Sequence, residues 1–84
     1  MTHDVTTEVK AFILERFLPE EDPGALEERT PLITNGILDS LATLQLVAFL
    51  EERFEIEVAA HETGIDYLNT ITDIAALVRS KQRP

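Results

Sequence analysis

Apolar residues recur at offsets of three and four positions in three stretches of the chain, residues 4–18, 39–54 and 71–80. That period places the apolar side chains on one face of an α-helix, and in the first stretch charged side chains fall on the opposite face. Asp4 or a neighbouring threonine supplies a cap for the first helix, and Pro19 ends it. We therefore predict three long helices.

The second stretch has the sequence DSLATLQLVAFLEERF and begins at Asp39 or Ser40. Its body is apolar nearly all round, apart from Thr43 and Gln45, and only its end is charged. A helix of this kind must be covered on several sides by the rest of the fold. We expect it to occupy a central position in a small bundle.

The segment between the first two helices, residues 19–39, contains turn-forming residues that include Pro31 and the pair Asn35-Gly36. A loop of this length is uncommon in a compact domain unless it is functional or held down. There is room for a short helical turn around residues 25–29. We expect the loop to be anchored by its apolar side chains, which are Leu26, Leu32, Ile33, Ile37 and Leu38.

The last third of the chain predicts a short helix followed by a long one. The short helix has room for only a turn or two, near residues 61–66. Thr70 followed by Asp73 resembles a capping box and starts the final helix. Only residues 54–58 are compatible with a strand. The prediction is an all-α fold, a small four-helix bundle with three longer helices plus one short third helix, formed by a single domain over residues 1–84.

Composition and charge narrow the function. The 84 residues include 16 Asp and Glu against 7 Lys and Arg, which gives a formal charge of -9, and no Cys. Acidic surfaces repel nucleic acid and anionic lipid, and a chain without Cys forms no disulfide or thiolate site. The N-terminus lacks a basic region followed by an apolar one, and no apolar run approaches the ~20 residues that span a bilayer. We expect a soluble, cytoplasmic monomer that does not insert into membranes.

Few residues are available for catalysis. The histidines are His3 and His61, and no G-x-S-x-G motif presents a serine nucleophile. The 3 glycines are isolated turn markers rather than a phosphate-binding loop, and the calcium-loop pattern D-x-[DN]-x-[DN]-G is absent. A hydrolase or lyase that uses His61 with a carboxylate is therefore disfavoured. We expect a protein that is not an enzyme and holds no metal.

The stretch Gly36–Leu41, with the sequence GILDSL, joins the long loop to the most apolar helix. In the simpler interpretation, which alone would be the more frequent case, Asp39 or Ser40 is an ordinary N-cap. In the functional interpretation, the Ser40 hydroxyl is displayed at a helix N-terminus. The free N–H groups and positive dipole end of the helix favour an attached phosphate there.

The run Asp39–Phe54 resembles the second helix of acyl carrier and peptidyl (aminoacyl) carrier proteins. In that family the serine of a D-S-L motif receives 4′-phosphopantetheine from coenzyme A. Other features agree with the resemblance: a charged amphipathic first helix, a long pinned loop, a short third helix, and a last helix opened by NTITDIAALV. The resemblance covers essentially the whole domain.

Carried onto this sequence, the resemblance makes Ser40 the covalent attachment site of 4′-phosphopantetheine. It makes Asp39 the acid that helps a phosphopantetheinyl transferase to dock, and Leu41 an apolar contact for partner enzymes. The transferase activates the serine, so the chain needs no base of its own. The thiol of the arm would carry an acyl or aminoacyl thioester, attached by a loading ligase and used by downstream transferases or synthases.

Departures from the family pattern narrow the subtype. Carrier proteins of fatty acid synthesis typically have acids directly after D-S-L and again three residues later, where this chain has Ala42 and Gln45. The approach Gly-Ile-Leu-Asp-Ser is more similar to that of stand-alone peptidyl, aminoacyl or specialised acyl carriers. We therefore favour a discrete carrier of an amino acid or an unusual acyl group. The predicted docking residues are Asp39, Leu41, Ala42, Gln45, Glu51 and Glu52.

Two alternatives stay open. One is an acyl carrier of fatty acid or polyketide synthesis, and the other is an unmodified acidic helical adaptor that uses Ser40 only as a cap. Four aromatic residues at helical spacing are either ordinary core, which we favour, or the lining of a pocket that shelters cargo. They are Phe12, Phe17, Phe49 and Phe54. Tyr67 and Leu68 are also expected to close the core.

Overall fold

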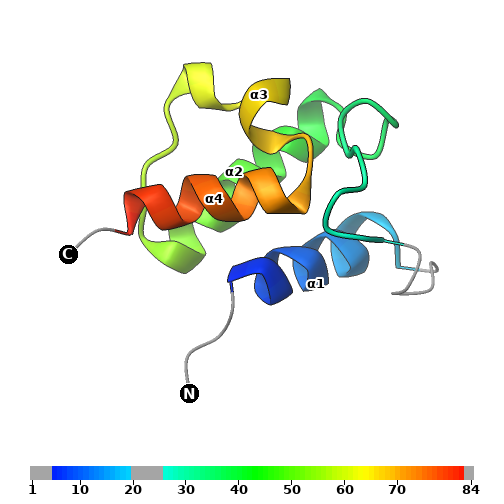
Figure 1. Cartoon of the computed structure of the whole chain (residues 1–84), viewed down its shortest axis with the longest axis horizontal. Coiled ribbons are helices and arrows are strands. Elements are labelled where there is room, and N and C mark those ends of the chain that lie inside the picture. The colour runs from blue at the N-terminus through cyan, green and yellow to red at the C-terminus, as the bar shows by residue number, and fades with distance from the viewer. Residues whose placement is uncertain (1–4, 20–25, 83–84) are drawn as a thin grey trace.

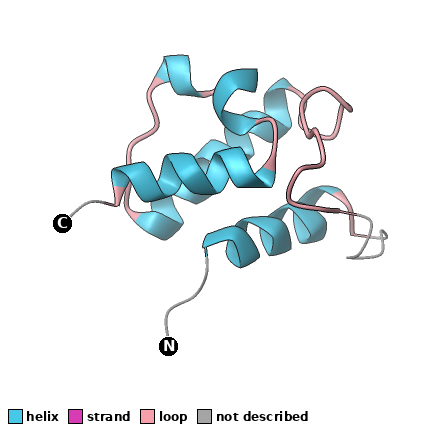
Figure 2. Cartoon of the chain, viewed as in Figure 1, coloured by secondary structure: helices cyan, strands magenta, loops and turns pink. Residues whose placement is uncertain are grey.

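The predicted all-α architecture is confirmed by a computed structural model, which describes residues 5–19 and 26–82. Within these residues every regular element is a helix, as the cyan ribbons of Figure 2 show. The elements in chain order are α1 (Val5–Phe17), α2 (Ser40–Phe54), a short 3₁₀ turn η2 (Ala60–Glu62), α3 (Ile65–Leu68) and α4 (Ile71–Lys81). The predicted cap Asp4 and the residue His3 lie outside the described residues.

The helices are arranged around one apolar core. In Figure 1, α1 and α4 lie side by side and run in opposite directions, while α2 crosses behind α4. Residues with essentially no exposed surface come from α1, α2, α3, α4 and the loop before α2, so that each of these segments is held by the others. They are Val9, Ile13, Leu26, Leu32, Leu46, Leu50, Leu68, Ile71, Ile74, Ala75 and Val78.

The central position predicted for α2 holds for only part of its length. Leu46 and Leu50 are fully buried, as a core helix requires. At its N-terminal end, however, Leu41 and Leu44 expose 64% and 65% of their surface. Leu41 and Leu44 are therefore not used for packing within the domain, whereas Ala42 between them is part of the core.

The four phenylalanines pack on one another where α1 meets α2. The rings of Phe12 and Phe49 are stacked with their centres 4.1 Å apart, and each meets a further ring edge to face. All four rings are partly buried against the core. This arrangement agrees with the core interpretation of these residues.

The loop before α2 is anchored as expected. Leu26, Leu32 and Leu38 are buried, and Ile33 and Ile37 pack against the core in partly buried positions. The helical turn considered around residues 25–29 is not formed over its described part. Instead, residues 27–30 form a turn in which the Thr30 N–H donates to the Glu27 carbonyl and the Glu27 N–H donates to the Thr30 hydroxyl.

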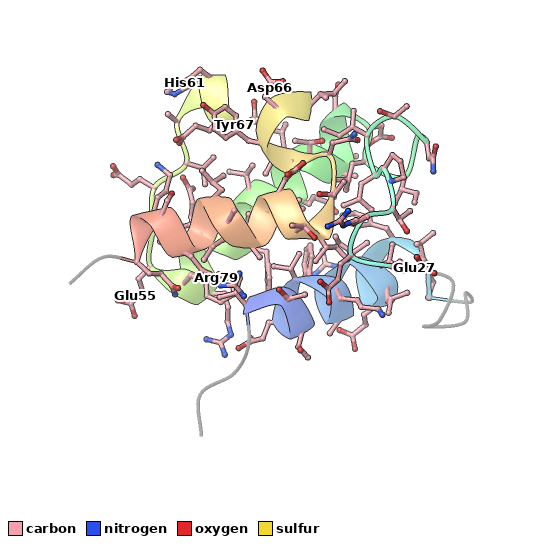
Figure 3. All side chains as sticks on the ribbon, in the orientation of Figure 1. Glu27, Glu55, His61, Asp66, Tyr67 and Arg79 are labelled. Carbon is pink, nitrogen blue, oxygen red and sulfur yellow. The ribbon has the colours of Figure 1, made fainter. Side chains whose placement is uncertain are left out.

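The short helix α3 lies slightly later in the chain than the predicted 61–66, because η2 occupies the first part of that stretch. Leu68 closes the core with no exposed surface, but the expectation for Tyr67 was wrong. Tyr67 is 36% exposed and meets the exposed His61 ring edge to face at 6.1 Å (Figure 3). The final helix begins as predicted, since the Thr70 hydroxyl accepts a hydrogen bond from the Asp73 N–H at 3.0 Å.

Candidate functional site

Asp39, and not Ser40, is the N-cap of α2. The Asp39 backbone is extended, its carboxylate accepts a hydrogen bond from the Ala42 N–H at 2.8 Å, and its carbonyl accepts one from the Thr43 N–H at 2.8 Å. The capping function is thereby supplied by the residue before Ser40. This leaves the Ser40 hydroxyl exposed in the first turn of the helix, and within the described part of the chain it forms no hydrogen bond. The hydroxyl is therefore accessible to another molecule.

The loop that leads to Ser40 is built from a tight turn. Gly36 has a φ of 80°, a left-handed conformation in which glycine is favoured, and its N–H donates to the Ile33 carbonyl at 3.0 Å. The N–H groups of Ile37 and Leu38 both donate to the Leu32 carbonyl, at 2.9 and 3.0 Å. These bonds set the path of the chain into α2.

A depression of about 660 Å³ opens beside Ser40. One side is formed by the loop and the first turns of α2, and the other by the start of α3. In Figure 1 this is the end of the molecule where α2, α3 and the loop before α2 meet. The lining residues are Ile33, Leu38, Asp39, Ser40, Thr43, Leu44, Thr63, Gly64 and Ile65.

Leu44 and Ile65, which line this depression, expose 65% and 55% of their surface, and Leu41, which directly follows Ser40, exposes 64%. Leu41 was anticipated from the sequence, whereas Leu44 and Ile65 were missed. The spacing of Leu44 carried a signal, because it lies three residues from Leu41 and two from the buried Leu46, and so on a different helix face from the core. The exposure of Ile65 had no signal in the sequence, since a helix of four residues is too short to show a period of apolar positions.

The other predicted docking residues lie in different environments. Ala42 is buried with 7% of its surface exposed, and Gln45 is half-buried. Glu52 is exposed, but it lies on the last turns of α2, about 18 Å along the helix from Ser40. The structure thus brings Asp39, Leu41 and Ser40 together and places Glu52 well away from them.

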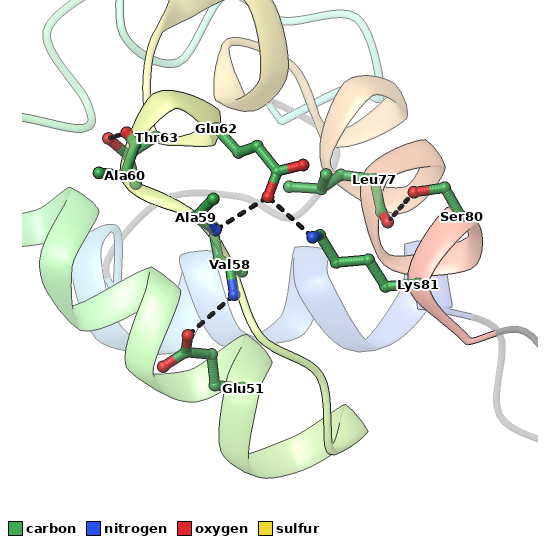
Figure 4. A network of polar contacts seen from close by, with 9 residues as sticks. All are labelled: Glu51, Val58, Ala59, Ala60, Glu62, Thr63, Leu77, Ser80 and Lys81. Carbon is green, nitrogen blue, oxygen red and sulfur yellow. Dashed lines mark hydrogen bonds and ion pairs between the residues drawn. The ribbon is translucent and has the colours of Figure 1, made fainter.

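Glu51 has a structural contact of its own. Its carboxylate accepts a hydrogen bond from the Val58 N–H at 2.9 Å, in the connection that follows α2 (Figure 4). The next N–H in the chain, that of Ala59, donates to the Glu62 carboxylate at 2.8 Å. The same carboxylate pairs with the Lys81 ammonium of α4 at 2.8 Å. The hydrogen bond from Lys81, followed by the one from the Ala59 N–H, lowers the pKa of the Glu62 carboxyl.

The histidine and the acidic side chains of the described residues do not gather into a metal-binding cluster. His61 is exposed and its ring contacts Tyr67 only at an edge. Residues 5–19 and 26–82 contain no group of three or more His, Cys, Asp or Glu side chains that could hold a metal ion. Nor does a helix in this part of the chain have the length and apolarity needed to cross a membrane.

The features of the site fit a covalently attached phosphate ester. An exposed hydroxyl stands in the first turn of a 15-residue helix, at the positive end of its dipole, where a phosphodiester is electrostatically favoured. A partly apolar depression adjoins it.

Comparison with known proteins gives a consistent result. No family model matches the chain. Among curated proteins, the D-alanyl carrier protein of Streptococcus sanguinis is 38% identical over 71 residues, and those of Streptococcus gordonii and Streptococcus thermophilus are each 39% identical over 71 residues. Each alignment covers 84% of this chain and 86% of the relative. The chain therefore belongs to the family of stand-alone carrier proteins that includes the D-alanyl carrier proteins.

Proposed function

We propose that this protein is a discrete aminoacyl carrier, in which Ser40 bears a 4′-phosphopantetheine arm that holds the amino acid as a thioester. The observation that carries the proposal lies at the start of α2. There Asp39 caps the helix, and the Ser40 hydroxyl is left exposed. The similarity to D-alanyl carrier proteins supports the aminoacyl subtype and makes D-alanine the first cargo to test.

Attachment of the arm requires little chemistry from this chain. The Ser40 oxygen forms a bond to the phosphorus of coenzyme A that carries the pantetheine, the pyrophosphate P–O bond breaks, and the adenosine bisphosphate leaves. A phosphopantetheinyl transferase takes up the serine proton, so no base is needed beside Ser40. The chain contributes an accessible hydroxyl, a helix N-terminus that favours the phosphodiester, and a rigid approach to the serine.

The surface around Ser40 suits successive, short-lived encounters. Leu41, Leu44 and Ile65 offer apolar contact next to the arm, and the charge of -9 steers the domain toward enzymes with basic entrances. We propose a loading ligase and a downstream transferase as the partners. A cytoplasmic location follows from this proposal, because coenzyme A and ATP are available there.

The attachment site is tested by intact-mass measurement after incubation with coenzyme A and a broad-specificity phosphopantetheinyl transferase. The wild type should gain the mass of one phosphopantetheinyl group, and Ser40→Ala should gain none. Ser80→Ala is the matched control, because Ser40 and Ser80 are the two serines of the chain. An unmodified wild type, or equal modification of Ser40→Ala, would contradict the proposal and favour the unmodified adaptor.

The cargo is tested separately on the modified protein. Incubation with ATP and a D-alanine-activating ligase should add one alanyl group that hydroxylamine removes, as expected for a thioester. Parallel reactions with L-alanine and with fatty acyl and malonyl donors, each with its own loading enzyme, separate the alternatives. Exclusive loading of acyl or malonyl groups would replace the aminoacyl carrier by a carrier of fatty acid or polyketide synthesis.

A further inference from the structure

Asn69 joins the α3–α4 junction to the loop that precedes α2. Its side-chain oxygen accepts hydrogen bonds from the N–H groups of Ile33 and Thr34, at 2.9 and 3.1 Å, and a weaker one from the Thr34 hydroxyl at 3.4 Å. Its backbone carbonyl accepts a further bond from the Leu32 N–H at 2.5 Å. Asn69 thus accepts hydrogen bonds from three consecutive loop residues, Leu32, Ile33 and Thr34.

The hydrogen bonds continue from this point to the modification site. The N–H of Leu32 donates to the Asn69 carbonyl. The Leu32 carbonyl in turn accepts hydrogen bonds from the N–H groups of Ile37 and Leu38. Leu38 is buried with 2% of its surface exposed and directly precedes the cap residue Asp39. A continuous series of backbone contacts therefore leads from Asn69 to the residue before the D-S-L motif.

Asn69 also holds one wall of the depression beside Ser40. The N–H of Ile33 donates to the Asn69 side chain, and Ile33 lines that depression together with Ile65 of α3. Asn69 itself is placed between two helices, since it ends α3 and directly precedes Thr70, the cap of α4. A second tie supports the junction, because the N–H and hydroxyl of Thr72 both donate to the Glu28 carbonyl, at 3.0 and 3.2 Å.

We propose that Asn69 is a positioning residue for Ser40. It holds the loop so that the serine, the loop wall at Ile33 and the α3 wall at Ile65 keep one relative arrangement, which the transferase and later partners recognise. This inference rests on the proposed function. It assigns Asn69 no contact with the arm or with cargo. The side-chain oxygen of Asn69 acts on the loop through Ile33 and Thr34, in addition to the backbone carbonyl that holds Leu32.

The variants follow from the chemistry of the contact. Asn69→Ala removes the acceptor shared by Ile33 and Thr34, whereas Asn69→Asp keeps an oxygen at the same place. Asn35→Ala is the matched control, since it removes an exposed asparagine side chain from the loop that Asn69 holds. Circular dichroism at the assay temperature measures the folded fraction of each variant, and rates are expressed per folded molecule.

The first readout is the steady-state rate of phosphopantetheine transfer at saturating coenzyme A, with the carrier concentration varied. We expect Asn69→Ala to lower kcat/KM by about tenfold per folded molecule, mainly through KM, because two loop N–H groups and the Thr34 hydroxyl lose their partner. Asn69→Asp and Asn35→Ala should stay within about twofold of the wild type. A folded Asn69→Ala protein with wild-type kcat/KM would overturn the inference, as would an equal loss in Asn35→Ala.

The second readout is amide hydrogen exchange, which does not depend on any enzyme. Asn69→Ala should accelerate exchange at Ile33, Thr34 and Leu38 while leaving Val9 of α1 unchanged. Uniform acceleration over the whole chain would indicate a purely structural role and sink the proposal. If the wild type were not modified at all, the proposed function and this inference would both fail, whereas wild-type modification with an unaffected Asn69→Ala would remove only the inference.

Discussion

The guanidinium of Arg53 donates to both carboxylate oxygens of Glu8, with two nitrogen–oxygen distances of 2.7 Å. The pair connects the last turn of α2 to the first turn of α1, residues that are 45 positions apart in sequence. Arg53 also places its guanidinium carbon 5.6 Å from the centre of the Phe54 ring. A bidentate geometry of this kind is more ordered than an ordinary surface ion pair.

The pair should contribute modestly to stability. The side chains are 45% and 17% exposed for Arg53 and Glu8, so water and salt screen their attraction. A double-mutant cycle with Arg53→Gln and Glu8→Gln should give a coupling energy of about 0.5–1 kcal/mol in urea denaturation, falling at high salt. Glu15→Gln, at an exposed glutamate of the same helix, serves as the uncoupled control. A coupling energy of zero at low salt would show that the contact is not populated in solution.

The Glu62–Lys81 contact should make stability depend on pH. Because Lys81 and the Ala59 N–H lower the pKa of Glu62 below its ordinary value of 4.5, the folded state binds this proton less readily than the unfolded state. The stabilisation is therefore complete above pH 4.5 and is lost as the pH falls through the lower pKa of the folded state. Glu62→Gln should melt below the wild type at pH 7, and the two melting temperatures should converge in acid.

Glu57→Gln is the control for this titration, since Glu57 is an exposed glutamate on the same connection. Its melting temperature should differ from the wild type by a small amount that does not follow the titration of Glu62. A gap for Glu62→Gln that stayed constant from pH 7 down to pH 3 would show that the carboxylate is not the group responsible.

Of the two glycines that the structure describes, Gly36 should tolerate alanine less. Its φ of 80° is unfavourable for a residue with a side chain, although an added Cβ would meet no atom within 4 Å. The cost is therefore one of backbone conformation, and Gly36→Ala should lower the free energy of unfolding by about 1 kcal/mol in urea titrations. Gly64→Ala is matched to it, because Gly64 has equally open surroundings but a φ of -98°. Equal losses at the two positions would contradict the conformational explanation.

Glu55 is the converse case, a residue with a side chain in a position that suits glycine. It ends α2 with φ 58° and ψ 51°, and its N–H donates to the Glu51 carbonyl. Glu55→Gly should raise the free energy of unfolding by about 0.5–1 kcal/mol, because the left-handed strain removed exceeds the added entropy of the unfolded chain. Glu55→Gln separates the effect of charge, and a gain of the same size in that variant would attribute the change to electrostatics instead.

Local sequence pattern was sufficient to predict the helices, but it was insufficient to predict the surroundings of Ser40. The periods of α1, α2 and α4 could be read directly, as could the cap at Thr70. The sequence could not decide between Asp39 and Ser40 as the cap of α2, because both residue types favour that position. The structure assigns the cap to Asp39 through its contact with the Ala42 N–H, and this leaves Ser40 accessible.

The sequence by itself determined an all-α fold, a pinned loop and a D-S-L helix start, because helical period, turn residues and caps are properties of neighbouring residues. Only the tertiary structure decided that Leu44 and Ile65 are exposed beside Ser40 and that Asn69 holds the loop leading to it. The Asn69 contact joins residues 36 positions apart. Hydrogen bonds over such a separation leave no periodic trace in the sequence, since they depend on how two segments meet after the core has formed.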